Sequence, residues 1–477
     1  MVFSSMTFLW VFFPLVLALY YSCSFIKNKN IQYSFKNSIL LIASLIFYAW
    51  GGIKYLFLML TSILGNYLFA LLIDVLDKKE KNKIKKIVFI LSITFNIGLL
   101  FYFKYINFFE KIIEGIFSCN IGLREVVLPI GISFFTFQSM SYVIDVYLKK
   151  IQCQRNLMIV TLYVSFFPQL VAGPIVKYID IENQLQERHE NIDQFVSGVR
   201  RFIFGLGKKV IVANLIGNVA EKIFSYDVAG LGTVCAWIGI LFYTIQIYYD
   251  FSGYSDMAIG IGRMFGFEFC ENFNYPYTSL SVQEFWRRWH ISLSTWFKEY
   301  VYIPLGGNRK GKVRTYINLF IVFLLTGLWH GANYTFLVWG IVYGIILVIE
   351  RLFLGDLLKR NKFKLLNWLY TMLVVVLLWV FFRAPNINYA FRYIKLLFIY
   401  SEGFLSVAQI SGLLEWVVLF FAILGAGPIH IIMQRLIINR EKGFYLFFDY
   451  VCQISILLFS IFLLINNTFN PFIYFQF

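Results

Sequence analysis

Charged residues are scarce in this chain of 477 residues. Asp, Glu, Lys and Arg make up only 14% of the sequence, whereas 59% of the residues are hydrophobic and 20% are aromatic. Soluble globular domains carry about 25% charged residues. The apolar runs are also too many and too long for a globular core, and each long run is able to span a bilayer. The composition therefore argues against a soluble domain and predicts an all-α polytopic membrane protein.

Acidic residues are scarcer than basic ones. The chain has 42 Lys and Arg against 26 Asp and Glu, a net charge of +16. In a soluble protein this balance would indicate a nucleic-acid partner. Here the cations cluster in short loops between apolar runs, as the positive-inside rule describes, and such loops also attract anionic lipids or a phosphorylated substrate. We expect the lipid bilayer as a partner and no nucleic acid.

Cysteines are few and widely spaced. The six cysteines form no CxxC or CxH pair, which argues against a metal site or a disulfide framework. The N-terminal apolar run lacks a basic region and a small-residue cleavage site, so we predict a retained first helix. No internal repeat, linker or low-complexity segment is visible. We predict one domain over residues 1–477, with about 11–13 membrane segments, some of them re-entrant.

Apolar runs and basic loops alternate along the chain. The strongest cytoplasmic signal is KKEKNKIKK at 78–86. Residues 157–176 contain proline and glycine and favour a broken or re-entrant helix. Two apolar runs joined at YYDFSGYSD are expected within 231–267, and two more within 315–350 surround His330.

His330 is the most informative single residue. It lies in the apolar run LFIVFLLTGLWHGA, where an ionisable side chain is costly and usually functional. A neutral imidazole in a dry cavity is able to accept a proton from a hydroxyl. Gly331 would leave room for a substrate, Trp329 would wall the pocket, and Asn333 is a further supporting candidate. The alternative is a packing histidine that hydrogen-bonds a neighbouring helix.

His290 follows the cluster Trp-Arg-Arg-Trp on an amphipathic segment, which fits a second site residue or an interfacial anchor equally well. The cations that follow offer a binding site for the phosphates of an acyl-CoA or of a carrier-protein phosphopantetheine. An ordinary positive-inside loop is the alternative. The candidate donor-binding residues are Arg287, Arg288, Lys298, Arg309 and Lys310.

Two carboxylates and one hydroxyl complete the candidates. Asp250 and Asp256 lie in an apolar region, where they orient a histidine, pair with an arginine or cap a helix that begins near Ser252. Capping is the expected role. Tyr474 belongs to the aromatic C-terminal tail 470–477, which is either an interfacial belt or a segment that enters a cavity and relays an acyl group.

Four stretches carry more specific motifs. The two-histidine block reads FWRRWHISLSTWFKEYVYIPLGGNRKGK and, further on, LTGLWHGANYTFLVWG. The other stretches are VLPIGISFFTFQSMSYVIDVYLKK (127–150), AGPIVKY (172–178) and YYDFSGYSDMAIGIGRMFGF (248–267). Together they resemble the membrane-bound O-acyltransferase family, in the branch typified by bacterial alginate O-acetyltransferase. The similarity covers most of the chain, with a motif core at about 127–350.

The resemblance implies a conical helix bundle in the bacterial cytoplasmic membrane, with a cytoplasmic cleft and an outer funnel that meet near a histidine. His330 matches the family's catalytic histidine, expected as general base, and His290 matches its supporting one. The donor is expected to be an acyl-CoA or an acyl-carrier thioester, and no tightly bound cofactor or metal is implied. The acyl group, most simply acetyl, passes to an extracytoplasmic polysaccharide, commonly through an SGNH-type partner that is membrane-anchored or extracytoplasmic.

Two alternatives remain open at this point. The related D-alanyl branch transfers D-alanine from a carrier protein to teichoic acid, and a tyrosine near the C-terminus of a short partner is implicated there. Tyr474 looks like a fused version of that element. A polysaccharide transporter without chemistry is the third hypothesis, motivated by the apolar, broken-helix architecture alone.

Overall fold

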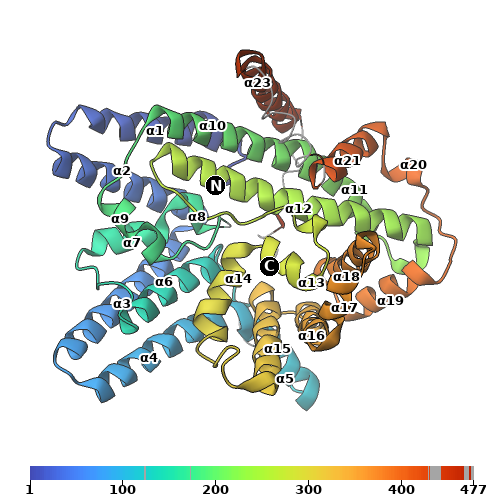
Figure 1. Ribbon diagram of the computed structural model, residues 1–477, viewed down its shortest axis with the longest axis horizontal. Coiled ribbons are helices and arrows are strands. Elements are labelled where there is room, and N and C mark those ends of the chain that lie inside the picture. Colours follow the sequence, from blue (N-terminus) through green and yellow to red (C-terminus); the bar gives the residue numbers. More distant parts are fainter. Residues whose placement is uncertain (123–124, 172, 428, 430–441, 467–471, 474–477) are drawn as a thin grey trace. The chain divides into compact units, whose positions relative to one another are not determined.

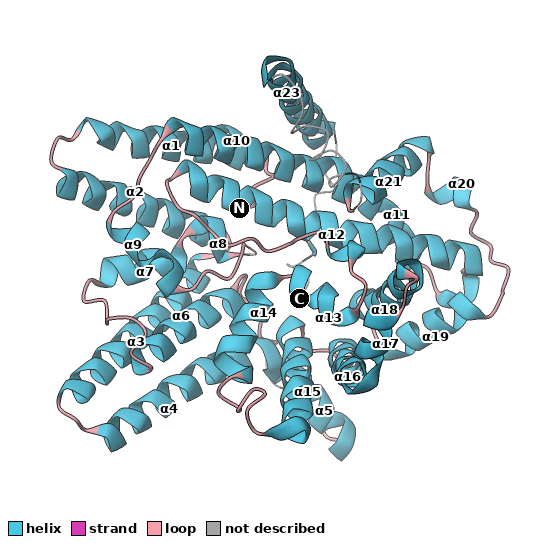
Figure 2. Ribbon diagram, viewed as in Figure 1, coloured by secondary structure: helices cyan, strands magenta, loops and turns pink. Residues whose placement is uncertain are grey.

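The computed structural model describes the whole chain except residues 123–124, 172, 428, 430–441, 467–471 and 474–477 (Figure 1). Every regular element in the described part is helical (Figure 2). Nine described helices are long and apolar enough to cross a membrane. They confirm the prediction of a multi-pass α-helical membrane protein. These spans are Phe8–Phe25, Ile53–Lys78, Asn82–Phe117, Ile192–Phe224, Thr233–Met264, Gly311–His330, Tyr334–Arg360, Lys364–Arg383 and Phe447–Asn466.

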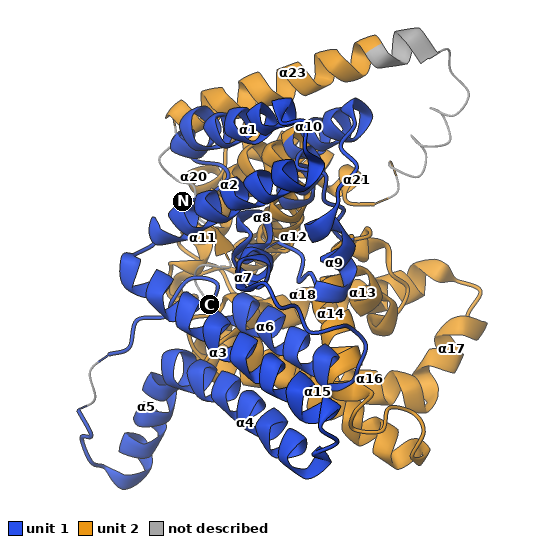
Figure 3. Cartoon of the chain, turned by 90° about the vertical axis from the view of Figure 1, so that its left-hand side faces the viewer, with its two compact units in different colours: residues 1–202, 257–270 blue, residues 203–256, 271–477 orange. Residues whose placement is uncertain are grey.

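The chain divides into two compact units (Figure 3). Unit 1 comprises residues 1–202 and 257–270, and unit 2 comprises residues 203–256 and 271–477. The elements up to the first crossing between units are η1 (Phe8–Phe12), α1 (Phe13–Ser22), η2 (Cys23–Phe25), α2 (Lys29–Ala49), α3 (Ile53–Lys78), α4 (Asn82–Leu100), η3 (Phe101–Tyr105), α5 (Ile106–Phe117), α6 (Ile132–Tyr147), α7 (Leu157–Ser165), α8 (Phe167–Leu170), α9 (Tyr178–Gln186) and α10 (Ile192–Gly207). The short helices α7 and α8 agree with the broken helix predicted for residues 157–176.

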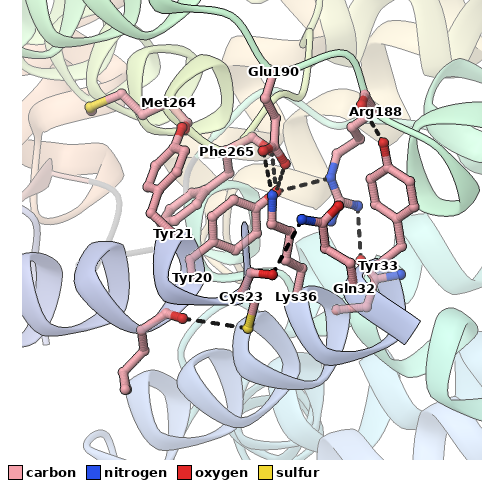
Figure 4. Close-up of polar contacts among 12 residues, drawn as sticks. Tyr20, Tyr21, Cys23, Gln32, Tyr33, Lys36, Arg188, Glu190, Met264 and Phe265 are labelled. Carbon is pink, nitrogen blue, oxygen red and sulfur yellow. Dashed lines mark hydrogen bonds and ion pairs between the residues drawn. The ribbon is translucent and has the colours of Figure 1, made fainter. Parts of the chain in front are cut away.

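A network of buried charged and polar side chains fastens the segment after α9 to α1 and α2 within unit 1 (Figure 4). Lys36 of α2 forms an ion pair with Glu190 at 2.5 Å, and the Tyr20 hydroxyl of α1 donates to the same carboxylate. Arg188 donates from Nη1 to Asn37 Oδ1 at 2.8 Å. Because a buried charge is costly unless it is paired and hydrogen-bonded, this network fixes the polar connection between α9 and α10.

Unit 2 holds an extensive hydrophobic core rich in aromatic residues. Its elements are η4 (Lys208–Asn214), α11 (Leu215–Phe224), η5 (Val228–Gly230), α12 (Thr233–Met264), η6 (Pro276–Thr278), α13 (Val282–Arg288), α14 (Ile291–Phe297), η7 (Lys298–Tyr302), α15 (Gly311–His330), α16 (Tyr334–Ile349), η8 (Glu350–Leu354), α17 (Gly355–Arg360), α18 (Lys364–Arg383), α19 (Ile387–Phe398), α20 (Val407–Ile410), α21 (Leu413–Gly425) and α23 (Lys442–Asn466). Helices α15 and α16 pack along each other as a hairpin. Trp339 of α16 and Trp379 of α18 are among its largest fully buried side chains.

Helix α12 differs from the sequence-based expectation. The sequence suggested two apolar runs joined at YYDFSGYSD, but the structure has one helix of 32 residues, whose last turns belong to unit 1. Gly253 does not break it, because a Cβ at this position would lie 2.9 Å from the carbonyl oxygen of Gly205 on α10. The glycine instead permits close helix packing, as small residues do in membrane proteins.

Candidate active site

His290 lies buried at the junction of α13 and α14, within unit 2. Its backbone is left-handed (φ 44°), a conformation that is uncommon for a non-glycine residue and turns the chain sharply between the two helices. Its Nδ1 lies 3.1 Å from the side-chain oxygen Oδ1 of Asn272. The same oxygen accepts hydrogen bonds from the hydroxyl of Ser292 at 2.9 Å and from its backbone N–H at 3.3 Å.

The Asn272 carboxamide determines which nitrogen of His290 carries the proton. A backbone N–H only donates, so the atom that faces the Ser292 N–H is the amide oxygen. The amide nitrogen donates in turn to the Ser255 hydroxyl at 3.0 Å. His290 Nδ1 faces the oxygen and must therefore be the protonated nitrogen, which leaves the lone pair on Nε2.

Burial also keeps His290 neutral. The side chain is fully buried, and this desolvation lowers the pKa of His290 to about 3. A neutral imidazole with a fixed tautomer is suited to accept a hydrogen bond or a proton through Nε2. The interfacial-anchor alternative for His290 does not fit this burial, because an anchor would keep contact with water or lipid headgroups.

His330 ends helix α15 and is held among aromatic rings. Its ring centroid lies 5.1 Å from that of Trp339 and 4.9 Å from that of Phe382. Trp329 contacts both histidines, at 5.9 Å from His290 and 5.0 Å from His330. The structure therefore brings both histidines next to one indole ring, whereas Trp329 is not among the residues that line the neighbouring cavity.

The two other residues of the His330 motif have structural contacts. A Cβ on Gly331 would lie 2.4 Å from the ring of Phe336, so that ring takes the room that the sequence suggested for a substrate. Asn333 caps α16, because its side chain accepts from the Thr335 N–H at 3.1 Å and donates to the Pro385 carbonyl at 3.2 Å.

The expected capping role of Asp250 and Asp256 is wrong. Both residues lie inside α12, where no helix begins. Asp250 forms an ion pair with Lys209 at 2.5 Å, and Asp256 forms one with Lys208 at 2.6 Å. The two lysines occupy the π-helical turn η4, directly opposite this part of α12. The carboxylates neutralise cations in a low-dielectric region, which the sequence could not show because the partners lie in another helix.

A cavity of about 390 Å³ extends along α15 within unit 2. Its apolar wall includes residues at helical spacing on one face of α15, namely Leu319, Val322, Phe323 and Thr326. The next position on this face, four residues after Thr326, is His330. The lining of α15 ends at Thr326, and the helix rises roughly 17 Å from Leu319 to His330.

Three cations line this cavity. Arg287 and Lys298 line it together with Arg351, which lies in η8 just after α16 and donates to Asn308 at 3.0 Å. Because α15 and α16 form a hairpin, Arg351 lies toward the beginning of α15, whereas His330 ends it. Arg287 and Lys298 were predicted as donor-binding residues, and Arg351 was not.

The other predicted cations lie elsewhere. Arg288 pairs with Glu284 on the same helix at 2.8 Å. Arg309 and Lys310 are exposed in the turn before α15, outside the residues that line the cavity. The charge pattern alone could not separate these positions, because all of them belong to one basic stretch of sequence.

Two residues of the C-terminal tail lie buried in unit 2. Tyr474 lies outside the described residues, but Phe472 and Ile473 directly precede it, and both are buried. The Ile473 N–H donates to Asp250 Oδ2 at 2.9 Å, and the Phe472 ring packs on Tyr254 at 4.7 Å.

Sequence reasoning missed Asn272 and Glu350. Buried Glu350 accepts hydrogen bonds from the Val282 and Gln283 N–H groups at 2.7 and 2.8 Å and so fixes the start of α13. Sequence reasoning also missed a polar cavity of about 800 Å³ in unit 1. The polar segment 177–195 was the only feature of the sequence that pointed to it. Amide side chains are frequent in its lining: Asn30, Asn183, Gln184, Gln186, Asn191 and Gln194.

Comparisons with known proteins agree with these features. A protein-family model, the membrane-bound O-acyltransferase family, matches residues 154–394. A probable alginate O-acetylase of Pseudomonas putida is 44% identical over 421 residues, which cover 87% of this chain and 84% of the relative. A peptidoglycan O-acetyltransferase of Helicobacter pylori is 40% identical over 75% of this chain and 72% of the relative. A teichoic acid D-alanyltransferase of Bacillus subtilis is 27% identical over 47% of this chain and 59% of the relative.

Proposed function

Because this chain belongs to the membrane-bound O-acyltransferase family and is a multi-pass membrane O-acyltransferase, we propose that it moves an acetyl group across the bacterial cytoplasmic membrane. The donor is a thioester on the cytoplasmic side, and the acceptor is an extracytoplasmic polysaccharide. Residues 1–477 act as a single catalytic domain. Two relatives of this chain that cover most of its length carry names of acetyl-transferring enzymes, which supports acetyl as the acyl group.

One observation carries the proposal: the residues of α15 that line the cavity end at Thr326, one turn before His330 on the same helical face. The cations that line the cavity suit the phosphates of a CoA or phosphopantetheine donor. The apolar wall of α15 suits the extended arm that carries the thioester. An arm laid along this face presents its thioester next to His330.

His330 serves as the general base in this scheme. It takes the proton from the attacking hydroxyl, the hydroxyl oxygen forms a bond to the thioester carbonyl carbon, and the carbon–sulfur bond breaks. The departing thiolate then receives a proton. A positioned base typically contributes about 10²–10⁴-fold to the rate. His290, which also contacts Trp329, supports the reaction with its Nε2 lone pair.

The direct test is His330→Ala, measured by mass spectrometry of the acetylated glycan in cells with matched protein levels. We expect acetylation to fall at least a hundredfold, in line with loss of a general base. His189→Ala is the matched control, because His189 is exposed in unit 1 and belongs to no part of the proposed mechanism. Unchanged acetylation in His330→Ala would overturn the assignment.

The donor-binding role of Arg287, Lys298 and Arg351 has its own test. Arg351→Gln is expected to raise the KM for the thioester donor about tenfold with a smaller change in kcat, because a charge-assisted hydrogen bond contributes about 1.5–3 kcal/mol. Exposed Lys310→Gln changes the charge equally outside the cavity and serves as control. Equal KM values for the two variants would remove Arg351 from the donor site. A comparison of acetyl-CoA with an acetylated carrier protein as substrates identifies the donor. The proposed reaction requires no tightly bound cofactor or metal.

The acceptor side includes Tyr474 and a partner protein. We propose that the acetyl group passes through the Tyr474 hydroxyl to an SGNH-type extracytoplasmic or membrane-anchored acetyltransferase, which modifies the polysaccharide. The burial of Ile473, the residue before Tyr474, supports entry of the tail into the membrane core. Tyr474→Phe removes only the hydroxyl and is expected to abolish acetylation. Full acetylation in this variant would exclude the relay.

D-Alanyl transfer from a carrier protein to teichoic acid is the alternative reaction. It has lower support, because the named D-alanyl relative matches only about half of this chain. Mass spectrometry of the wall polymer separates the two products by mass. Membership of an O-acyltransferase family makes the third hypothesis, a transporter without chemistry, untenable.

A further inference from the structure

The last described residues of the chain are held inside unit 2 by a backbone hydrogen bond. Phe472 and Ile473 are 4% and 5% exposed, although the helix before them, α23, exposes most of its surface. The Ile473 N–H donates to Asp250 Oδ2 at 2.9 Å. Phe472 also lies under the Lys209 ammonium group, 5.8 Å from its ring centroid.

The acceptor of this hydrogen bond is half of a buried ion pair. The Asp250 and Lys209 side chains are 2% and 3% exposed and meet at 2.5 Å through Asp250 Oδ1. Two apolar residues would fill this position without the cost of desolvating two charges. The pair leaves Asp250 Oδ2 available for a backbone amide from a segment 223 residues away. A carboxylate is a stronger acceptor for that amide than a neutral side chain.

The same two turns of α12 hold the tail and His290. Asp250 and Tyr254, four residues apart and hence on one helical face, contact Ile473 and Phe472. Phe251, beside Asp250, packs edge-on against the His290 ring at 4.6 Å. Helix α12 therefore contacts both the end of the described chain and the ring of His290, through neighbouring residues.

We propose that the Asp250–Lys209 pair is a docking site for the C-terminal segment of this chain, with Asp250 as its acceptor and Lys209 as the ion-pair partner that orients the Asp250 carboxylate. Both are positioning residues that set where the segment after Ile473 begins. The docking stands independently of the acyl-transfer reaction, whereas its use in acyl relay rests on the function proposed above.

Amide hydrogen exchange of the intact protein in detergent tests the docking. The key comparison is the double variant Lys209→Met/Asp250→Leu against Lys209→Met/Asp250→Asn. Both remove the ion pair without leaving a lone buried charge, and only the asparagine keeps an acceptor oxygen. We expect the Ile473 amide to exchange about tenfold or more faster in the leucine variant than in the wild type, with the asparagine variant in between. Equal exchange in the two double variants would overturn the proposal.

A second pair of variants leaves the ion pair, and hence the fold of α12, untouched. Ile473→Pro removes the N–H donor, whereas Ile473→Val keeps it at nearly the same size. We expect the remaining amides of the peptide 467–477 to exchange faster in the proline variant only. Equal exchange in the proline and valine variants would also overturn the docking.

Glycan acetylation in the same variants separates docking from function. If His330→Ala abolishes acetylation and Lys209→Met/Asp250→Leu does not, the positioning role in acyl relay is refuted while the proposed function stands. If His330→Ala leaves acetylation intact, the proposed function is refuted, and hydrogen exchange at Ile473 still decides whether the tail docks at Asp250.

Discussion

Asn272→Ala is expected to damage both the stability of the protein and the chemistry at His290. The asparagine oxygen accepts hydrogen bonds from His290 Nδ1, the Ser292 hydroxyl and the Ser292 N–H, and the side chain is only 1% exposed. Leaving a buried donor without its acceptor costs about 1–3 kcal/mol. For the two N–H groups alone the loss is about 2–6 kcal/mol. Without Asn272 Oδ1, the proton of His290 is no longer held on Nδ1. Acetylation should therefore fall along with stability.

Thermal unfolding in detergent and glycan acetylation in cells check this prediction together. Asn274→Ala is a matched control in the same segment, because Asn274 is exposed and uses its backbone, not its side chain, to meet Arg288. We expect Asn274→Ala to melt and acetylate like the wild type. If Asn272→Ala behaves like Asn274→Ala, the Asn272 side chain neither stabilises this site nor fixes the tautomer of His290.

Two further predictions concern the same site. The folded-state pKa of His290, about 3, lies below its ordinary value near 6.5, so the unfolded chain binds a proton that the native protein does not. His290 should therefore cost stability as pH falls from about 6.5 toward 3, at up to about 1.4 kcal/mol per pH unit. Melting of His290→Asn at pH 7 and pH 5 should show a shallower loss than the wild type, and identical losses would contradict the assignment. Gly331→Ala places a methyl group 2.4 Å from the Phe336 ring and should destabilise by about 1–3 kcal/mol. Adding Phe336→Leu should restore part of the melting temperature, and a double variant no more stable than Gly331→Ala would contradict the steric explanation.

The fold class was accessible from composition because the bilayer imposes one solution on a long apolar run, a helix. The prediction that His330 is functional has the same origin, since an ionisable residue in such a run is costly. The role of Asn272 could not be predicted, because nothing in the neighbouring sequence distinguishes an asparagine that hydrogen-bonds a histidine from an ordinary loop residue. Asp250 and Asp256 were misread because a local rule, helix capping, was applied to residues whose partners lie in η4. Hydrophobic periodicity predicts the helices but does not predict contacts between residues that are distant in the sequence.

The paired charges of η4 and α12 also bear on how the protein is made. Lys208 is synthesised 48 residues before its partner Asp256, and Lys209 similarly precedes Asp250. Each lone lysine or aspartate near the centre of a membrane helix opposes insertion by about 2.5–3.5 kcal/mol. The segment Ile192–Phe224 and helix α12 are thus poor independent substrates for insertion, yet as a hairpin they enter with both charges neutralised. We expect the insertion machinery to retain the first of these segments until the second emerges from the ribosome.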